Sequence, residues 1–267
     1  MPNHDPTSSL AWIAEELARL ESTGLRRERG HSSGTQGATI EIGGGGVGEF
    51  GANDFLGLAA DPRLVGAAAD AARQFGWGSG ASPLVSGRSA VHVELERRLA
   101  KFEGTEAALL FTSGYAANTG TIAALVGADD AVFSDAKNHA SLIDGCRLSR
   151  TEVFIYPHGD ADALENQLRD ARGFRRRLVV TDGLFSMDGD LAPLERLAEL
   201  AEQYDAMLLV DEAHATGVFG ERGRGACEAL GVENRVSLRI GTISKALGGI
   251  GGFVAGPREA IEWLANR

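Results

Sequence analysis

Polar and charged residues stand directly after short apolar runs of this sequence, where strands of a sheet are expected to end. Asp211 and His214 follow the run 207–210, and Lys245 follows the run 239–243. Ligands of an open parallel sheet bind beyond the carboxyl ends of its strands, so these side chains are expected to meet at one edge. A lysine among small residues can have its pKa lowered and attack a carbonyl group as a free amine, and a strand-end carboxylate can hold a pyridinium nitrogen protonated. The order of these residues therefore indicates amine chemistry on a carbonyl compound.

A turn suited to a phosphate group lies earlier in the chain. Ser113, Gly114 and Tyr115 follow the apolar run that ends at residue 111, and they open a predicted helix. Backbone N–H groups at a helix start bind anions, helped by the helix dipole. Glycine makes up 36 of the 267 residues and gathers at 43–46, 76–80 and 248–252. Glycine lets the backbone approach a ligand closely, although ordinary turns explain such glycines equally well.

The elements that would position these residues alternate along the chain. Helices with an apolar face are predicted at 10–20, 62–75, 90–102, 116–125, 160–170, 193–204 and from 257 onward. Short apolar runs at 107–111, 131–133, 153–156, 178–181, 207–210 and 239–243 predict strands between them. This alternation favours an α/β fold with a mostly parallel sheet covered by helices on both faces. The segments 39–42 and 48–50 flank a glycine run and are predicted to form two further strands, paired as a short hairpin. We therefore expect an N-terminal helix and hairpin segment at 1–55 and a large domain at 56–267.

The composition argues against several classes of function. Lysine and arginine number 26 against 37 acidic residues, a net charge of −11 and a pI near 5.1. An acidic protein is a poor partner for nucleic acid or an anionic membrane surface. No apolar run approaches the ~18 residues of a membrane helix, and the polar stretch 1–10 lacks the features of a targeting peptide. Cys146 and Cys227 lie far apart, so we expect two reduced thiols in a cytoplasmic protein.

The D-E-A-H string at 211–214 has a second interpretation, because some helicases carry it at a metal-binding strand end. Such enzymes need a G-x-x-x-x-G-K-[ST] phosphate loop upstream, and this sequence holds none. A protein metal site is not expected either. The six histidines show no H-E-x-x-H spacing, and the two cysteines show no ligand spacing.

Eight strings, in order along nearly the whole chain, resemble the α-oxoamine synthases. They are N-D-F-L-G-L (53–58), G-S-G-A-S-P-L-V-S-G (78–87), H-x-x-L-E-x-x-L-A (92–100), S-G-Y-A-A-N (113–118), N-H-A-S (138–141), T-D-G-L-F-S-M-D-G-D (181–190), D-E-A-H-A-T-G-V-F-G (211–220) and T-I-S-K-A-L-G-G (242–249). The resemblance implies the aspartate aminotransferase fold, also called pyridoxal phosphate fold type I. It also implies pyridoxal 5'-phosphate as the cofactor and 56–267 as the domain that binds it.

The resemblance also assigns roles to matching residues. Lys245 would bind the cofactor covalently and move the α-proton of the substrate, and Asp211 would pair with the pyridine nitrogen. His139 would stack over the cofactor ring and face the substrate, although a buried, hydrogen-bonded histidine is the alternative. Further cofactor contacts would come from Gly114, Tyr115, Ser186, His214, Thr242 and Ser244.

Two residues near the N-terminus would meet the substrate or the partner subunit. Arg26 matches a substrate-binding arginine of the family, although Arg27 fits the same position and a solvated helix-end cation is the alternative. Asn53 matches a position near the cofactor and the subunit interface. Asp182 departs from the glutamate that relatives often carry, which shortens the side chain by one methylene.

The activity that the resemblance implies is a decarboxylating condensation of an amino acid with an acyl thioester. The A-S-P-L-V-S-G and D-E-A-H-A-T-G strings favour L-alanine and a pimeloyl thioester, of coenzyme A or a carrier protein, in biotin synthesis. A glycine C-acetyltransferase, which more often carries D-D-S-H, or another family member is the alternative. We expect a homodimer with the glycine-rich stretches 76–80 and 248–252 near its two-fold axis. Family members continue into a small C-terminal domain that this chain does not supply, so a cofactor-binding fragment without turnover is a further alternative.

Overall fold

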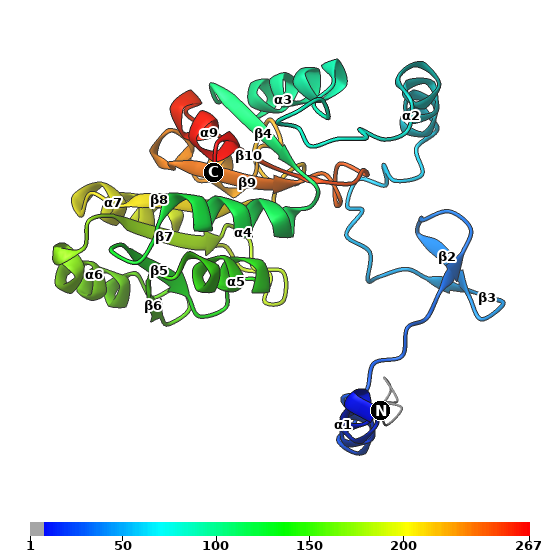
Figure 1. Cartoon of the computed structure of the whole chain (residues 1–267), viewed down its shortest axis with the longest axis horizontal. Coiled ribbons are helices and arrows are strands. Elements are labelled where there is room, and N and C mark those ends of the chain that lie inside the picture. Colours follow the sequence, from blue (N-terminus) through cyan, green and yellow to red (C-terminus); the bar gives the residue numbers. More distant parts are fainter. Residues whose placement is uncertain (1–7) are drawn as a thin grey trace, which may run out of the picture. The chain divides into compact units, whose positions relative to one another are not determined.

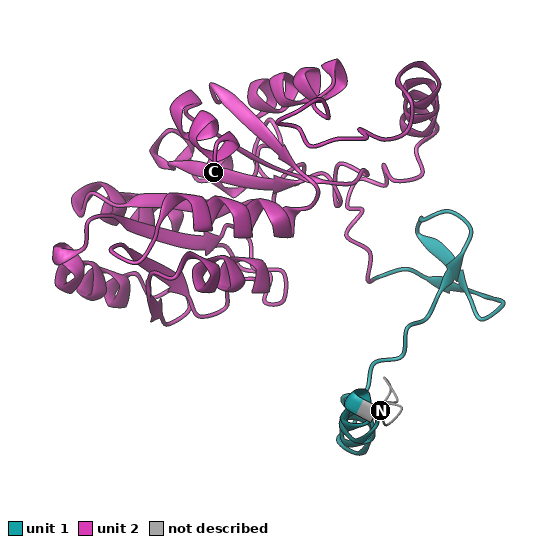
Figure 2. Ribbon diagram, viewed as in Figure 1, with its two compact units in different colours: residues 1–50 teal, residues 51–267 magenta. Residues whose placement is uncertain are grey.

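The computed structural model describes residues 8–267 and divides the chain into two compact units, residues 1–50 and 51–267 (Figures 1 and 2). Residues 1–7, most of the polar stretch considered for a targeting signal, lie outside the described residues. Among the described residues, no helix has the length and apolar character needed to cross a membrane.

The first unit holds a helix and a small antiparallel sheet. It contains η1 (Ser8–Leu10), α1 (Trp12–Ser22), β1 (Ser32–Ser33), β2 (Thr39–Ile42) and β3 (Gly45–Gly48). The predicted hairpin is present, but the prediction of its second strand at 48–50 is wrong. Gly43 and Gly44 have φ values of +61° and +82°, the backbone of a two-residue hairpin turn, so β3 begins immediately after them.

The second unit is built on a seven-stranded sheet in the order β4-β10-β9-β8-β7-β5-β6 (Figure 1). The strands are β4 (Ala107–Phe111), β5 (Ala131–Asp135), β6 (Glu152–Tyr156), β7 (Arg177–Asp182), β8 (Met207–Asp211), β9 (Leu238–Thr242) and β10 (Gly252–Gly256). Neighbours from β6 to β9 pair in parallel, whereas β10 is antiparallel to both β9 and β4. The expected mostly parallel sheet is therefore confirmed. It contains one strand, β10, that was not predicted.

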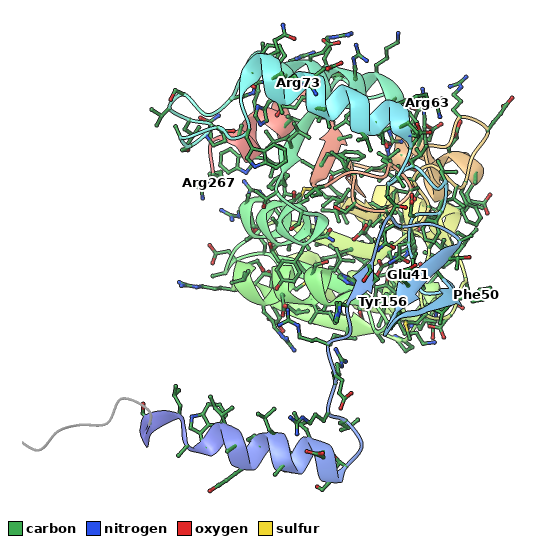
Figure 3. All side chains as sticks on the ribbon, turned by 90° about the vertical axis from the view of Figure 1, so that its right-hand side faces the viewer. Glu41, Phe50, Arg63, Arg73, Tyr156 and Arg267 are labelled. Atoms are coloured by element: carbon green, nitrogen blue, oxygen red, sulfur yellow. The ribbon has the colours of Figure 1, made fainter. Side chains whose placement is uncertain are left out.

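Most helices of the second unit fall close to their predicted positions, whereas the helices at 140–149 and 226–229 were not predicted. They are α2 (Pro62–Phe75), α3 (Ala90–Glu103), α4 (Gly114–Leu125), α5 (Ala140–Ser149), α6 (Ala161–Asp170), α7 (Leu194–Gln203), α8 (Ala226–Ala229) and α9 (Arg258–Ala265), with η2 (Ala171–Gly173) and η3 (Glu233–Arg235) between them. α2 begins where expected because Pro62 fits the first turn and Asp61 accepts a hydrogen bond from the backbone N–H of Arg63. The solvent-facing Arg63 and Arg73 of this helix are labelled in Figure 3.

Both faces of the sheet are buried by helices. Along β7, Val179 packs into a cluster with residues of α6 and α7, whereas Leu178 and Val180 pack into a second cluster with residues of α4, α5 and α9. Alternate residues of a strand point to opposite faces, so an apolar run this continuous requires cover on both sides. Tyr156 at the end of β6, labelled in Figure 3, is among the largest fully buried side chains. The two cysteines are buried and free.

Candidate functional site

Three strands of the parallel sheet end in buried aspartates. Asp135 ends β5, Asp182 ends β7 and Asp211 ends β8, and none of the three is more than 5% exposed. Asp182 and Asp211 are direct partners in the register of β7 and β8. Burial, and after it the negative charge of Asp211, raise the pKa of Asp182 to about 8. This sheet edge therefore concentrates carboxyl groups where the sequence predicted a ligand.

The amine of Lys245 reaches the same edge from the loop after β9. Its Nζ lies 2.7 Å from Nε2 of His214, in the loop after β8. An ammonium group can only donate, so Nε2 of His214 is the acceptor. Burial, and after it the charge of Lys245, lower the pKa of His214 to about 4. Burial also lowers the pKa of Lys245, against the carboxylates of Asp211 and Asp182, which raise it. The pair thus contains an amine that loses its proton more easily than a solvated lysine does.

The carboxylate of Asp211 is held by two neutral donors. Its Oδ1 accepts the backbone N–H of Ala213 at 2.8 Å, and its Oδ2 accepts the side-chain amide of Asn118 at 2.6 Å. Neither bond comes from a cation, so the charge of the carboxylate is available to a positively charged ligand atom.

His139 caps the start of α5. Its backbone N–H donates to Oδ2 of Asp182 at 2.7 Å, and its Nδ1 accepts the backbone N–H of Ser141 at 3.2 Å. Its side chain is exposed, whereas Asp182 and Ser141 are buried. The interpretation of His139 as a buried histidine is therefore wrong. Its position at the start of α5 leaves the ring exposed, while its backbone N–H is bonded to the buried Asp182.

The turn at the start of α4 lies against the ends of β9 and β10. Ser113 caps the helix by accepting the backbone N–H of Ala116 at 3.1 Å. A Cβ added to Gly114 would lie 3.4 Å from Cβ of Thr242, and one added to Gly252 would lie 2.4 Å from the carbonyl oxygen of Ser113. The first N–H groups of a helix lack intrahelical partners, so this packed turn presents backbone donors to a ligand.

Thr242 and Ser244 both bond to one glycine of the loop that precedes β10. The hydroxyl groups of Thr242 and Ser244 donate to the carbonyl oxygen of Gly251 at 3.0 and 3.2 Å. Tyr115, next to Gly114, donates its hydroxyl hydrogen to Oδ2 of Asp144 at 2.7 Å and is exposed. The structure therefore brings Gly114 and Thr242 together, with Ser244 on the same loop.

Three predicted residues are not tied to this group by any described contact. Ser186 is exposed in the loop between β7 and α7, and Asn53 is exposed near the start of the second unit. Arg26 belongs to the first unit and pairs with Glu21. The roles assigned to these residues stay predictions.

The residues that hold the site in place were not identified as functional from the sequence. Asn118 bonds to Asp211, and Asn138 accepts the backbone N–H of Asp182 at 3.0 Å while donating to the carbonyl oxygen of Val180 at 2.9 Å. Both asparagines stand inside quoted strings, S-G-Y-A-A-N and N-H-A-S. An asparagine inside a helix or at a helix start carries no sign of which distant strand it contacts.

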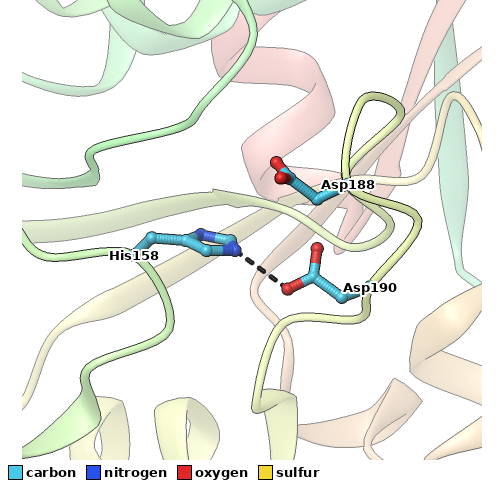
Figure 4. A group of neighbouring side chains, drawn as sticks. All are labelled: His158, Asp188 and Asp190. Carbon is cyan, nitrogen blue, oxygen red and sulfur yellow. Dashed lines mark hydrogen bonds and ion pairs between the residues drawn. The ribbon is translucent and has the colours of Figure 1, made fainter.

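A neighbouring cluster of side chains contains His158, Asp188 and Asp190 (Figure 4), and His158 connects the loop after β7 to the end of β5. His158 lies between Oδ1 of Asp135 and Oδ2 of Asp190, at 2.9 Å from each. Burial opposes protonation of His158, but the two carboxylates raise its pKa. Lys137 pairs with Asp188 at 2.9 Å. His158, Asp188 and Asp190 lie close enough to share a metal ion. Lys137 already pairs with Asp188, and His158 already bonds to Asp190. We therefore interpret the cluster as a set of contacts that holds the loop after β7 in place.

The comparisons with known proteins fit this fold and site. The model of the family "aminotransferase class I and II" matches residues 46–267, and the chain belongs to that family. The chain is 55% identical over 259 residues to an 8-amino-7-oxononanoate synthase of Anaeromyxobacter sp. (strain K), an alignment that covers 97% of this chain and 65% of that relative. The chain thus spans slightly less than two thirds of the length of this relative. Within the family, the chain belongs to the α-oxoamine synthases.

Solved structures of two family members resemble the chain. A serine palmitoyltransferase from S. paucimobilis, solved with a bound PLP–myriocin aldimine, has a TM-score of 0.90 and 33% identity, covering 98% of this chain and 67% of that one. An 8-amino-7-oxononanoate synthase from Francisella tularensis has a TM-score of 0.69 and 30% identity, covering 81% of this chain and 60% of that one. The aminotransferase fold expected from the strings is therefore confirmed.

Proposed function

We propose that this chain carries the cofactor-binding residues of an 8-amino-7-oxononanoate synthase. The reaction would be the decarboxylating condensation of L-alanine with a pimeloyl thioester of coenzyme A or a carrier protein, a step of biotin synthesis. The observation that carries the proposal is the 2.7 Å contact of Lys245 with His214 at the sheet edge where Asp211 ends its strand. The 55% identity to a relative of that name supports the choice of reaction.

The donor set fits pyridoxal 5'-phosphate. Among the described residues, Asp211 bonds to neutral donors alone, and such a carboxylate suits a protonated pyridine nitrogen. The turn at Gly114, too tight for a side chain at Gly252, suits a phosphate group that backbone N–H groups hold. Tyr115, Thr242 and Ser244 would add hydroxyl groups to it.

Each residue of the site would then have a separate role toward the cofactor or the substrate. Bound pyridoxal phosphate supplies an electron sink for the α-carbon of the amino acid. Asp211 keeps the pyridine nitrogen protonated, and His214 donates a hydrogen bond to the phenolic oxygen. His139 covers one face of the ring, and Ser186 contacts the cofactor from its loop. Lys245 binds the cofactor aldehyde through its amine, and later removes and returns the α-proton.

The atoms of the reaction balance without an oxidant or a metal ion. The α-carbon of alanine forms a bond with the thioester carbonyl carbon, and the thiol leaves. The carboxyl group of alanine leaves as carbon dioxide, and a proton takes its place. The lowered pKa of Lys245 suits this role, because a proton carrier works best with a pKa near the working pH.

The partners of the chain belong to the proposal as well. Arg26 would bind the substrate, and Asn53 would lie near the cofactor and a second subunit. We propose a homodimer in the cytoplasm, with the glycine-rich stretches 76–80 and 248–252 near its two-fold axis. Nucleic acid and membrane are not proposed as partners, because the chain carries a net charge of −11.

A second candidate is another α-oxoamine synthase reaction, which the TM-score of 0.90 to a serine palmitoyltransferase favours. The test loads the chain with pyridoxal phosphate and offers L-alanine, glycine and L-serine, each with pimeloyl-, acetyl- and palmitoyl-coenzyme A. Released thiol and carbon dioxide are measured together. The proposal predicts equal amounts of both, largest for alanine with the pimeloyl thioester. A larger yield with glycine or serine contradicts the assignment, and cofactor binding without thiol release supports the fragment alternative.

A further inference from the structure

The side chain of Asn118 joins two elements that the proposed function uses. Asn118 lies on α4, is 1% exposed and donates both hydrogens of its amide group. One goes to Oδ2 of Asp211 on β8 at 2.6 Å, and the other goes to Oγ of Ser141 on α5 at 2.9 Å. α4 and α5 pack against one another, which keeps Ser141 within reach. An amide nitrogen has two hydrogens, so its donor capacity is fully used.

The connection continues from Ser141 to the imidazole of His139. Oγ of Ser141 lies 2.7 Å from Nδ1 of His139, and the backbone N–H of Ser141 points to the same nitrogen at 3.2 Å. A backbone N–H can only donate, so Nδ1 is an acceptor and the proton of the neutral ring is on Nε2. Because Asn118 donates to Oγ, the hydroxyl hydrogen of Ser141 is free to point at Nδ1. The donor and the acceptor of each hydrogen bond from Asn118 to His139 are therefore defined.

We propose that Asn118 is a positioning residue that couples the carboxylate of Asp211 to the imidazole of His139 through Ser141. The inference rests on the proposed function, in which these two groups contact the nitrogen and the face of one cofactor ring. Asn118 fixes the direction of the carboxylate, and through Ser141 it fixes the tautomer and the orientation of the imidazole. Such a connection makes the two contacts respond together when either is changed.

A packing role alone is the competing explanation, because Asn118 is buried between two helices. Thr121 provides a matched control. It lies on the same helix, is fully buried, and its hydroxyl oxygen has no hydrogen-bond partner in the described part of the chain. Thr121→Val removes a buried hydroxyl group without touching the bonds of Asn118, whereas Asn118→Leu keeps about the same volume and removes both bonds.

The first test reads the ring of His139 directly, in protein without cofactor. The chain is labelled with ¹⁵N-histidine, and His139→Gln assigns the signal in a proton–nitrogen spectrum. We expect an unprotonated Nδ1 and a protonated Nε2 in the parent and in Thr121→Val. In Ser141→Ala and Asn118→Leu we expect a shifted Nδ1 signal, with both tautomers present. An unchanged Nδ1 signal in Asn118→Leu overturns the proposal. If that variant fails to fold, Asn118→Ser takes its place under the same criterion.

The second test measures the coupling through cofactor affinity. Asp211→Asn and His139→Asn are made singly and together, and the Kd for pyridoxal phosphate is measured for each. We expect the double variant to depart about tenfold from the product of the single effects, and to agree with that product when Asn118→Ser is also present. An equal departure in both backgrounds overturns the proposal. If the chain binds no pyridoxal phosphate, the proposed function fails, while the spectrum of His139 still decides the role of Asn118.

Discussion

Lys245 donates a hydrogen bond to His214 across 2.7 Å, and burial lowers the pKa of both partners. Lys245 comes from the loop after β9 and His214 from the loop after β8, so two neighbouring parallel strands set their separation. A neutral imidazole beside an amine cannot compete for its proton as a carboxylate would. The pair therefore favours an amine that reacts near neutral pH.

Acid should destabilise the fold through His214. Its pKa of about 4 in the folded chain lies below the ordinary 6.5, so the unfolded chain binds more protons between these values. Folding stability then falls as the pH drops from 6.5 towards 4. Partial solvent screening reduces the contribution to about 1–2 kcal/mol. Urea unfolding at pH 7 and pH 5 should show a smaller loss in His214→Gln than in the parent. The exposed His31 serves as a control, and an equal loss in His31→Gln and His214→Gln would contradict the assignment.

Asp182 should act in the opposite direction. Its pKa of about 8 in the folded chain lies above the ordinary 3.8, so the folded chain binds more protons between these values. The contribution of Asp182 to stability is therefore present below pH 4 and is lost as the pH rises towards 8. Asp182→Asn resembles the protonated carboxyl group and keeps an oxygen for the backbone N–H of His139.

We expect Asp182→Asn to be more stable than the parent at pH 8, by about 1–3 kcal/mol, and close to it at pH 4. Denaturant titrations at the two pH values measure the difference. Asp129→Asn changes an exposed aspartate and should give the parent values at both. A loss of stability at pH 8 in Asp182→Asn would show that the carboxylate is charged in the folded chain.

Replacing Asp211 should separate cofactor binding from proton transfer. Asp211→Asn keeps the size of the side chain and removes the charge that favours a protonated pyridine nitrogen. We expect pyridoxal phosphate to bind, and exchange of the alanine α-proton for deuterium to slow by at least ~100-fold. Proton NMR of alanine in deuterium oxide follows the exchange, with Asp129→Asn, which changes an exposed aspartate before β5, as a control. Exchange at the parent rate in Asp211→Asn would mean that another group protonates the ring.

The parts of the fold that follow local rules could be predicted from the sequence. β4 and α2 have the predicted bounds because an apolar run and a proline with its capping aspartate define them locally. The ends of β7 and β8 were placed within one residue, and this placed Asp182 and Asp211 at one edge.

The parts that depend on distant contacts could not be predicted. α5 has no periodic apolar face, because Gly145 is packed so closely on Ile122 that an added Cβ would lie 2.9 Å from its side chain. β10 is short and follows a glycine run, so its own sequence does not mark it as a strand. Its pairing with β4 and β9 determines its conformation. The bond from Asn118 to Asp211 joins residues 93 positions apart, a separation at which residue type gives no signal.

The central claim, that Lys245 carries the cofactor, can be tested by reducing the loaded protein with borohydride and mapping its peptides. The sequence holds three lysines, Lys101, Lys137 and Lys245, so the result is unambiguous. Lys137 pairs with Asp188, whereas burial lowers the pKa of Lys245, which leaves it the more reactive amine. We predict loss of the visible absorbance and a pyridoxyl adduct on Lys245. An adduct on Lys101 or Lys137, or no adduct in protein that has bound the cofactor, would contradict the claim.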